Sequence, residues 1–405
     1  MKHKKIDYPN ELNIIFEKLN KNGIKVILIG GFVRDKLLKI NSKDIDIELF
    51  NLESLNLLEK ILKEFGNVNS VGKSFGVCKL KYKGLDLDFS LPRSDSKYSK
   101  GHKGFEVKID SSLDFKTAAS RRDFSMNAIG YDIKEQCILD PFNGIGDLNN
   151  SLIKAVDLQK FIEDPLRVLR AIQFAARFGF SIDEALFSEC KDMVKKGLLE
   201  ELPKERIYTE LEKLLLKSTL PSIGLRLAKE LNIVNYFGDY NSLDRVDYFA
   251  LHKTTDKKTN MLIFLTLLYA DDSFKQIEKI TSEVKLIKNV KIFLETRSNF
   301  SLENLSNYKI YKLATEVNIE IFSSYLSAFY LGKEDDKIKE LKELANSLGV
   351  LTAKAPAFIQ GRDIISLGLS PSKEFKKILD ESYTAQIKEV FHTKGEALIW
   401  LRDRL

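Results

Sequence analysis

Two aspartates, Asp44 and Asp46, alternate within a short apolar segment of the sequence. On a β-strand, side chains two residues apart point to the same face, so both carboxylates would lie on one side of a sheet. Two carboxylates on one rigid face can hold two magnesium ions about 3.5–4 Å apart, the separation used for in-line displacement at phosphorus. The pair therefore predicts a metal site for phosphoryl or nucleotidyl transfer.

A glycine pair and an arginine precede these aspartates at a spacing that suits phosphate binding. The apolar segment 25–29 leads into Gly30, Gly31 and Arg34. Glycines let backbone N–H groups approach a triphosphate at a helix N-terminus, where the helix dipole favours anions. The planar guanidinium of Arg34 can reach the same phosphates. The alternative is a surface strand with two solvated acids beside an ordinary turn, but the combination favours nucleotidyl transfer.

A second alternating pair, Asp86 and Asp88, offers a third carboxylate. Both would share one face of a strand at 85–91, because they are two residues apart. Either could complete a carboxylate trio with Asp44 and Asp46. The alternative is that both are solvent-facing acids of an edge strand, and for Asp86 we favour that alternative.

Residues 121–128 combine positive charge with short polar side chains. Arg121 and Arg122 can neutralise a triphosphate, while Asp123 and Asn127 can hydrogen-bond ribose hydroxyls, which would favour ribonucleotides. Ion pairing of the arginines with Asp123 or with distant acids is an alternative that the residues leave open.

Asp164, Arg167 and Arg170 are spaced three apart and would fall along one side of a helix start. An aspartate that accepts from an exocyclic amine and an arginine that donates to ring acceptors could recognise a base edge, much as side chains recognise DNA. The alternative is purely structural. Asp164 would then cap the helix, Pro165 would take the first helical position, and Glu163 would pair with Arg167.

The elements that must position these residues change character near residue 150. Before it, the sequence predicts an α/β or α+β catalytic domain with strands at 25–29, 44–49, 75–82, 85–91 and 127–133 and helices at 10–22, 31–39, 52–65 and 114–121. A turn-rich segment, 140–148, closes that domain. After Asp147 only helices are predicted, with Ser181 and Pro203 as start signals, at 165–178, 183–197, 204–217, 221–231 and 258–270.

Composition limits the class of protein. A chain of 405 residues suggests two to four domains, and a net charge of +6 permits nucleic-acid binding without proving it. No apolar run is as long as a membrane span, and the basic N-terminus lacks the apolar region of a signal peptide. The three cysteines have no C-x-x-C spacing, so neither a zinc site nor a disulfide framework is indicated, and a reducing cytoplasm fits.

Together, these blocks resemble the class II tRNA nucleotidyltransferase and bacterial poly(A) polymerase superfamily. They follow the family's order over about residues 24–217: Gly30-Gly31-x-Val33-Arg34-Asp35, Asp44-x-Asp46, Arg121-Arg122-Asp123-Phe124-x-x-Asn127-Ala128, Asp140-Pro141…Gly144…Asp147-Leu148, Glu163-Asp164-x-x-Arg167 and Glu205-Arg206-Ile207. The resemblance implies an α/β head (1–148) with a polymerase-β-like nucleotidyltransferase fold, followed by an all-α neck (149–234), body (235–350) and tRNA-binding tail (351–405).

The resemblance also implies roles for the candidate residues. Asp44 and Asp46 correspond to the metal-binding catalytic carboxylates, and Asp88 matches the third acidic position. Asp164 and Arg167 match the side chains that pair with incoming CTP or ATP in place of a nucleic-acid template. The candidate nucleotide-binding set is Gly30, Gly31, Arg34, Arg122, Asp123, Asn127, Asp164, Arg167 and Arg170.

The expected reaction is the Mg²⁺-dependent addition of C, C and A to the 3′ end of tRNA from CTP and ATP, with release of pyrophosphate. Residues 93–105 resemble the intact flexible loop of relatives that add all three nucleotides, and 361–371 resemble the tail of tRNA-directed members. An A-adding or CC-adding transferase, a poly(A) polymerase and a catalytically inactive RNA-binding protein remain alternatives. No membrane partner is expected, and the sequence does not set the oligomeric state.

One departure concerns the histidines. Many relatives carry a phosphohydrolase domain with His-Asp motifs in the C-terminal half, but none of His3, His102, His252 and His392 is followed by aspartate. We therefore expect a helical body without such a metal site.

Overall fold

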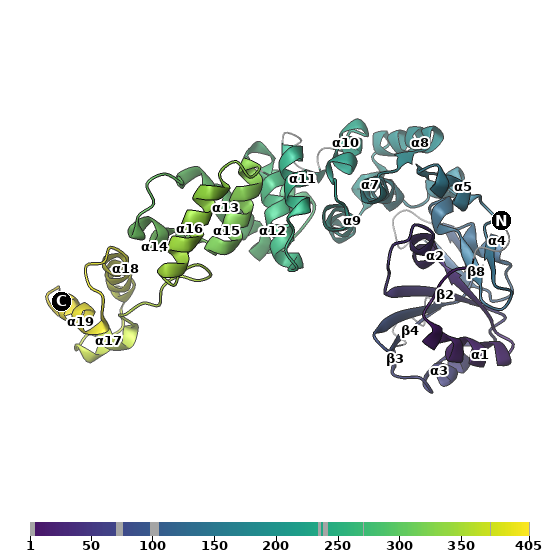
Figure 1. Cartoon of the computed structure of the whole chain (residues 1–405), viewed down its shortest axis with the longest axis horizontal. Helices are drawn as coiled ribbons and strands as arrows, with labels where there is room; N and C mark the ends of the chain where they lie inside the picture. The colour runs from purple at the N-terminus through teal and green to yellow at the C-terminus, as the bar shows by residue number, and fades with distance from the viewer. Residues whose placement is uncertain are drawn as a thin grey trace. The chain divides into compact units, whose positions relative to one another are not determined.

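The computed structural model describes residues 5–69, 76–97, 105–233, 236–237, 242–269, 271–372 and 374–404. The chain divides into two compact units, one of residues 1–214 with 227–233 and the other of residues 215–226 with 234–405. In Figure 1 the strands of the first unit carry the purple and blue colours, and the helices of the second unit run from green to yellow. No helix within these described ranges is long and apolar enough to cross a membrane.

The first unit is built on a mixed sheet whose described strands are ordered β3-β4-β5-β2-β1-β8-β9. The central strand β2 pairs in parallel with β5 and antiparallel with β1. The strands are β1 (Lys25–Ile29), β2 (Asp44–Phe50), β3 (Val68–Asn69), β4 (Val77–Tyr82), β5 (Leu85–Ser90), β8 (Gly130–Asp132) and β9 (Cys137–Leu139). A separate hairpin joins β6 (Arg93–Lys97) to β7 (Phe105–Ile109).

The two faces of this sheet are covered differently. On one face Ile27, Ile29 and Phe50 form a cluster with Ala118 and Phe115 of helix α4 (Phe115–Ala119). On the other side α1 (Asn13–Lys21) and α3 (Leu55–Leu62) pack against β1 and β4. Residues paired across adjacent strands share a face, and Ile27 is paired with Glu48 of β2. The acidic side chains of β2 therefore lie on the α4 side of the sheet.

Beyond residue 150 the described chain is almost entirely helical, which confirms the predicted change of character. The helices that complete the first unit and form the second are α5 (Gly144–Asn149), α6 (Leu158–Phe161), α7 (Leu166–Phe178), α8 (Glu184–Lys195), α9 (Lys204–Lys217), α10 (Ser222–Glu230), α11 (Leu243–Leu251), α12 (Lys257–Leu268), α13 (Val284–Asn299), α14 (Asn307–Glu316), α15 (Ile319–Tyr330), α16 (Asp335–Ser347), α17 (Gly361–Ser366), α18 (Glu374–Ile387) and α19 (Lys394–Arg402). The last three share a hydrophobic cluster that includes Ile364, Phe391 and Leu401. The division into head, neck, body and tail stays a prediction.

Two local predictions were wrong. Ser181 does not start a helix, because its backbone N–H donates to the carbonyl of Ser151 in a short parallel pairing of β10 (Leu152–Ile153) with β11 (Ser181–Ile182). Asp183 caps α8 instead by accepting from the N–H of Leu186. The strand predicted at 127–133 is shorter, because residues 125–127 form a 3₁₀ turn that directs Asn127 into the interior.

Candidate active site

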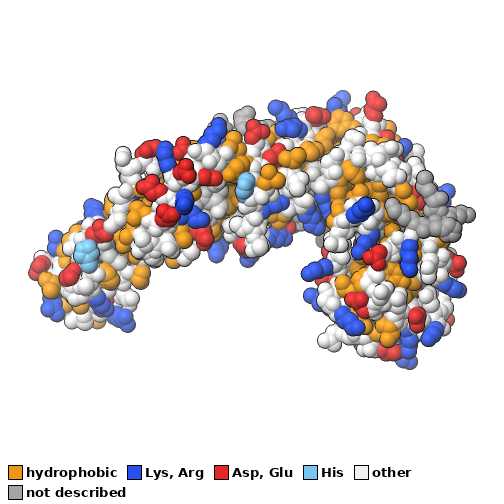
Figure 2. Space-filling view, viewed as in Figure 1, with side chains coloured by type: hydrophobic (Ala, Val, Ile, Leu, Met, Phe, Trp, Pro, Cys, Tyr) orange, Lys and Arg blue, Asp and Glu red, His pale blue; other side chains and the backbone are white. Residues whose placement is uncertain are grey.

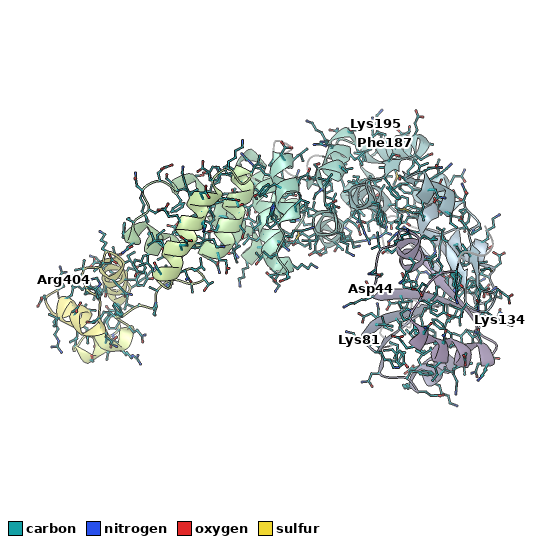
Figure 3. The ribbon with its side chains drawn as sticks, in the orientation of Figure 1. Asp44, Lys81, Lys134, Phe187, Lys195 and Arg404 are labelled. Carbon is teal, nitrogen blue, oxygen red and sulfur yellow. The ribbon has the colours of Figure 1, made fainter. Side chains whose placement is uncertain are left out.

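The acidic face is formed where β2 and β5 run side by side. Their parallel register places Asp44 opposite Asp86 and Asp46 opposite Asp88, so all four carboxylates lie on one face. Asp44 and Asp86 are exposed, whereas Asp46 and Asp88 are half-buried. Figure 3 labels Asp44 of β2 and Lys81 of β4, which lie on strands separated by β5. The structure thus brings the predicted acids together and leaves both Asp86 and Asp88 available as the third.

The pKa of Asp46 depends on its burial and on the charged side chains around it. Burial raises the pKa of this carboxyl above its ordinary value, the Arg122 guanidinium opposes the shift, and the like charges of Asp88 and Asp44 add to it. A carboxyl surrounded by other carboxylates in a partly buried position favours a bound cation. Asp88 is thus one of the charges that act on Asp46, and its role as the third acid stays a prediction.

Lysines of β4 supply the cations that the acids contact in this structure. The Lys79 ammonium lies 2.5 Å from the carboxylate of Asp88, and that of Lys81 lies 3.7 Å from Asp86. Across the described residues, no three histidine, cysteine, aspartate or glutamate side chains are grouped so that they could hold a metal ion. Magnesium commonly binds to one or two carboxylates together with water and substrate phosphates. The acidic face fits an ion of that kind rather than one held in a closed protein cage.

Glu48 extends the acidic row and was missed by the sequence reasoning. It is fully buried on β2, and one carboxylate oxygen lies 3.3 Å from Nη2 of Arg121 and 3.9 Å from Nη2 of Arg122. Since α4 ends at Ala119 on the same face, the chain that follows it delivers both arginines to this acid. The alternation of Asp44, Asp46 and Glu48 is the signal that could have revealed it.

Gly30 is required by close packing. Its φ is +64°, and a Cβ atom there would lie 2.8 Å from Nη1 of Arg122 and 3.7 Å from the Asp46 carboxylate. Its own N–H donates to the carbonyl of Ile129. The N–H of Gly30 is therefore already used within the protein, and the predicted approach of backbone N–H groups to a triphosphate stays a prediction. Gly31 lies beside Asp46 with an ordinary φ, and its absent Cβ would be 3.8 Å from that carboxylate.

Asp123 and Asn127 form a buried polar cluster with helix α7. One Asp123 oxygen accepts from the Asn127 amide at 2.9 Å, and the other accepts from Nε of Arg170 at 2.6 Å. Burial alone would raise the pKa of Asp123, but Arg170 and the Asn127 amide outweigh it and hold the pKa below its usual value. The Arg170 guanidinium also lies 4.0 Å from the buried carboxylate of Glu210. Arg170 is therefore placed at the predicted ribose ligands.

Arg34 does not occupy the position expected of a phosphate ligand. Its side chain is only 4% exposed. Its Nε and Nη2 donate to Asp35 at 2.8 and 2.6 Å, and its Nη1 donates to the Asn127 side-chain oxygen at 2.5 Å. Because these donors are used within the protein, the geometry favours a role in holding Asn127 over direct contact with phosphates.

Asp164 and Arg167 are both held in place by protein groups, in agreement with the capping role of Asp164, and recognition of a base edge stays a prediction. One Asp164 oxygen accepts from the N–H of Leu166 like a helix cap, while the other lies 3.2 Å from Nη2 of Arg206. Arg167 donates to the carbonyls of Lys160 and Arg121, each at 2.7 Å. The sequence motif contained Arg206 but did not indicate its role, and the ion pair with Asp164 shows that Arg206 holds this carboxylate.

The loop predicted over residues 93–105 can be followed only at its ends. Strands β6 and β7 flank it, and residues 98–104 lie outside the described ranges. Its resemblance to the loop of enzymes that add all three nucleotides therefore stays a prediction.

Family models match two parts of the chain. Residues 26–154 match the poly A polymerase head domain, and residues 179–238 match a probable RNA and SrmB-binding site of polymerase A. The first match contains Asp44, Asp46 and Asp88, and the second contains Arg206.

The curated relatives that match the chain are named as CCA-adding enzymes or multifunctional CCA proteins. A CCA-adding enzyme of Staphylococcus haemolyticus is 26% identical over 98% of both chains, and one of Lactococcus lactis is 29% identical over 90% of this chain and 89% of its own. A multifunctional CCA protein of Stenotrophomonas maltophilia is 34% identical over 206 residues. The chain spans about half the length of that multifunctional protein and nearly the whole length of the other two.

Solved structures share the fold from end to end. The CCA-adding enzyme of Bacillus stearothermophilus in complex with CTP superposes with a TM-score of 0.77 at 21% identity over 98% of both chains. The Thermotoga maritima enzyme complexed with tRNA gives 0.65 at 22% identity over 100% of this chain and 99% of its own. These likenesses confirm the fold, a nucleotidyltransferase head followed by helical segments. The head-domain match and the curated relatives agree with the family resemblance of the sequence and make the chain similar to CCA-adding enzymes.

Proposed function

We propose that this chain adds C, C and A to the 3′ end of tRNA, using CTP and ATP and releasing pyrophosphate. The observation that carries the proposal is one compact unit that holds three parts. These are the acidic face of Asp44, Asp46 and Asp88, the Asp123–Asn127 cluster, and the anchored pair at the start of α7. The first suits metal-dependent transfer, the second a ribose and the third a base edge.

We propose magnesium as the metal, held by Asp44 and Asp46 with Asp88 beside them. Carboxylate oxygens are the hard ligands that this ion prefers. When bound, magnesium supplies positive charge that polarises phosphoryl oxygens and lowers the pKa of a hydroxyl. The protein's own part is to keep three carboxylates on one rigid face and to direct the Arg122 guanidinium toward Asp46.

Nucleotide recognition follows from the polar groups of the neck. Asp123 and Asn127 would accept and donate hydrogen bonds to ribose hydroxyls from positions that Arg34 and Arg170 hold. Two carbonyls fix the Arg167 guanidinium, which carries five N–H donors, so it can present remaining donors to a base in a set orientation. Asp164, fixed by Arg206, would accept from an exocyclic amine.

The acceptor proposed for this site is tRNA, and the second unit is proposed to contact it. Lysine and arginine side chains are spread among acids over the face seen in Figure 2, and the chain has a net charge of +6. Scattered positive charge attracts a phosphate backbone without specifying its sequence. We also propose a cytoplasmic location, which fits three cysteines without C-x-x-C spacing.

The test is extension of three acceptors, tRNA ending at its discriminator base, after C, and after CC. Each is given CTP, ATP or both, with magnesium, and the products are separated on a gel. The proposal expects growth to CCA followed by a stop. Addition of A alone to the CC-ending acceptor would indicate an A-adding specialist, and addition that stops after CC would indicate a CC-adding one. A long A ladder would indicate a poly(A) polymerase. No extension would favour an inactive RNA-binding protein.

A further inference from the structure

A closed ring of polar contacts joins the first helix after β1 to the neck helix α7. Arg34 donates to both Asn127 and Asp35, and the other oxygen of Asp35 accepts from Nη2 of Arg177 at 3.1 Å. Asn127 donates to Asp123, which accepts from Arg170 on the same helix as Arg177. The ring therefore starts in α2 (Gly30–Leu37), reaches α7 at two points and returns.

Aromatic side chains fill the ring. Phe174 and Phe178 of α7 stack with centroids 5.8 Å apart, and the Arg34 guanidinium lies 5.0 and 4.9 Å from their centroids. The Arg170 guanidinium lies 5.3 Å from the Phe174 centroid, and that of Arg177 lies 4.8 Å from the Phe178 centroid. Such cation–π contacts strengthen when they are shielded from water, as the buried Arg34 is here.

The two attachment points are spaced to control the helix. Arg170 and Arg177 are seven residues apart, two helical turns, so they lie on the same side of α7 and about 10 Å apart along its axis. Two polar contacts at separate turns add to the packing of the buried face of α7 and restrict its tilt more than one contact would. Arg167 lies one turn before Arg170, and Asp164 lies just before the helix, so both move with it.

We propose that the ion pair of Asp35 and Arg177 is a positioning device that determines nucleotide choice, because it holds α7 so that Asp164 and Arg167 face the nucleotide held at Asp123 and Asn127. This inference rests on the proposed function. Neither Asp35 nor Arg177 needs to touch the substrate. Loosening the far attachment point lets the start of α7 shift, which harms discrimination between two bases more than it harms the chemical step.

The test compares four variants: Arg177→Met, Arg177→Lys, Asp35→Asn and the double variant Asp35→Asn/Arg177→Met. Arg177→Met removes both the positive charge and the hydrogen-bond donors of the guanidinium. Lys25→Met is the matched control, because it breaks a 2.9 Å ion pair with the buried Asp132 of the same sheet outside the ring. For each protein, kcat and KM are measured for ATP and for CTP on the CC-ending acceptor. Thermal unfolding establishes that each variant is folded.

In Arg177→Met the ratio of kcat/KM for ATP to that for CTP should fall at least about tenfold, which corresponds to about 1.4 kcal/mol. The change should come mainly through KM, and the double variant should lose no more than the worse single variant, since the two residues act as one unit. Arg177→Lys should keep part of the ratio, and Lys25→Met should leave it within about twofold.

An unchanged ratio in folded Arg177→Met or Asp35→Asn overturns the inference, and so does an equal loss of kcat for both nucleotides, which a merely structural role would produce. Should Arg177→Met fail to fold, the ratios of Arg177→Lys and Asp35→Asn decide in the same way. Wild-type protein that incorporates no nucleotide overturns the proposed function and this inference with it, whereas active wild type with unaltered variants overturns the inference alone.

Discussion

The acidic face of the sheet and the polar ring around α7 both consist of charged side chains, yet they are built in opposite ways. On the face, Asp44 is exposed, and burial together with the like charges of Asp88 and Asp44 raises the pKa of Asp46, so these carboxylates suit a bound cation. In the ring, Arg34 and Asp123 are buried. Arg34 is paired with Asp35 and Asp123 with Arg170, so each forms an ion pair and hydrogen bonds within the protein. Grouped like charges suit the binding of a metal ion, whereas the paired charges of the ring keep the nucleotide-binding side chains in fixed positions.

The largest expected effect comes from a substitution on the acidic face. Asp44→Ala should lower nucleotide incorporation by about 10³-fold or more, since it removes a proposed ligand of the magnesium that would stabilise charge on the reacting phosphates. Its unfolding free energy should change little, because the side chain is exposed. Asp86→Ala is the matched control and should keep most of the rate, while Asp88→Ala should not. A near-normal rate of nucleotide incorporation by Asp44→Ala would show that Asp44 is not a ligand of the catalytic metal.

The next effect concerns the polar ring around α7, where the loss of unfolding free energy depends on pH. Arg170→Met should cost about 2–3 kcal/mol of unfolding free energy at pH 7, less than for a fully buried pair, because the Arg170 side chain is 30% exposed. Asp123 has a lowered pKa, so its contribution is present above the unfolded value of about 3.9 and is lost as the pH falls through the folded one. The deficit should therefore shrink on acidification toward pH 3. Urea unfolding across that range measures it, and a deficit independent of pH would contradict the pairing.

A smaller effect separates packing from substrate binding at the glycine pair. Gly30→Ala should destabilise the protein by about 1–2 kcal/mol, because alanine disfavours a φ of +64° and its Cβ would press on Arg122. Gly31→Ala should be within about 0.5 kcal/mol of wild type, since its φ is ordinary and its nearest contact is 3.6 Å. Denaturant unfolding compares the two. Equal losses would show that close packing is not what requires Gly30.

The smallest effect concerns the lysine beside the acids. Lys79→Met should lower the magnesium concentration for half-maximal rate by up to about fivefold, because an exposed ion pair is worth about 0.2–1 kcal/mol and this one competes with the metal for Asp88. Lys81→Met, whose pair with Asp86 is longer and more exposed, should change it less. A higher magnesium requirement in Lys79→Met would mean that Lys79 assists the metal rather than competes with it.

Alternation and spacing predicted the fold class and the acidic face well. Asp44, Asp46, Asp86 and Asp88 share a face because a strand has a period of two, and the register of β2 with β5 brings them together as expected. The change to helices near residue 150 was equally visible, since periodicity is a local property.

Arginines were harder to assign from sequence. Arg34 and Arg122 both looked like phosphate ligands, but which acid a long side chain meets depends on contacts between residues far apart in the chain. Arg34 meets Asn127, 93 residues away, and Arg177 meets Asp35, 142 residues away. Glu48 was missed because a buried acid within an apolar strand resembles no motif until its partner arginines are in place.

The most direct test of the account is the choice of nucleotide by Arg167→Ala, measured beside Asp44→Ala in single-turnover incorporation of ATP and CTP on the CC-ending acceptor. The account predicts that Arg167→Ala keeps a measurable rate but loses the preference for ATP, whereas Asp44→Ala loses the rate with both nucleotides. An unaltered preference in Arg167→Ala would contradict the claim that this neck residue selects the base and would leave it a part of the helix start alone.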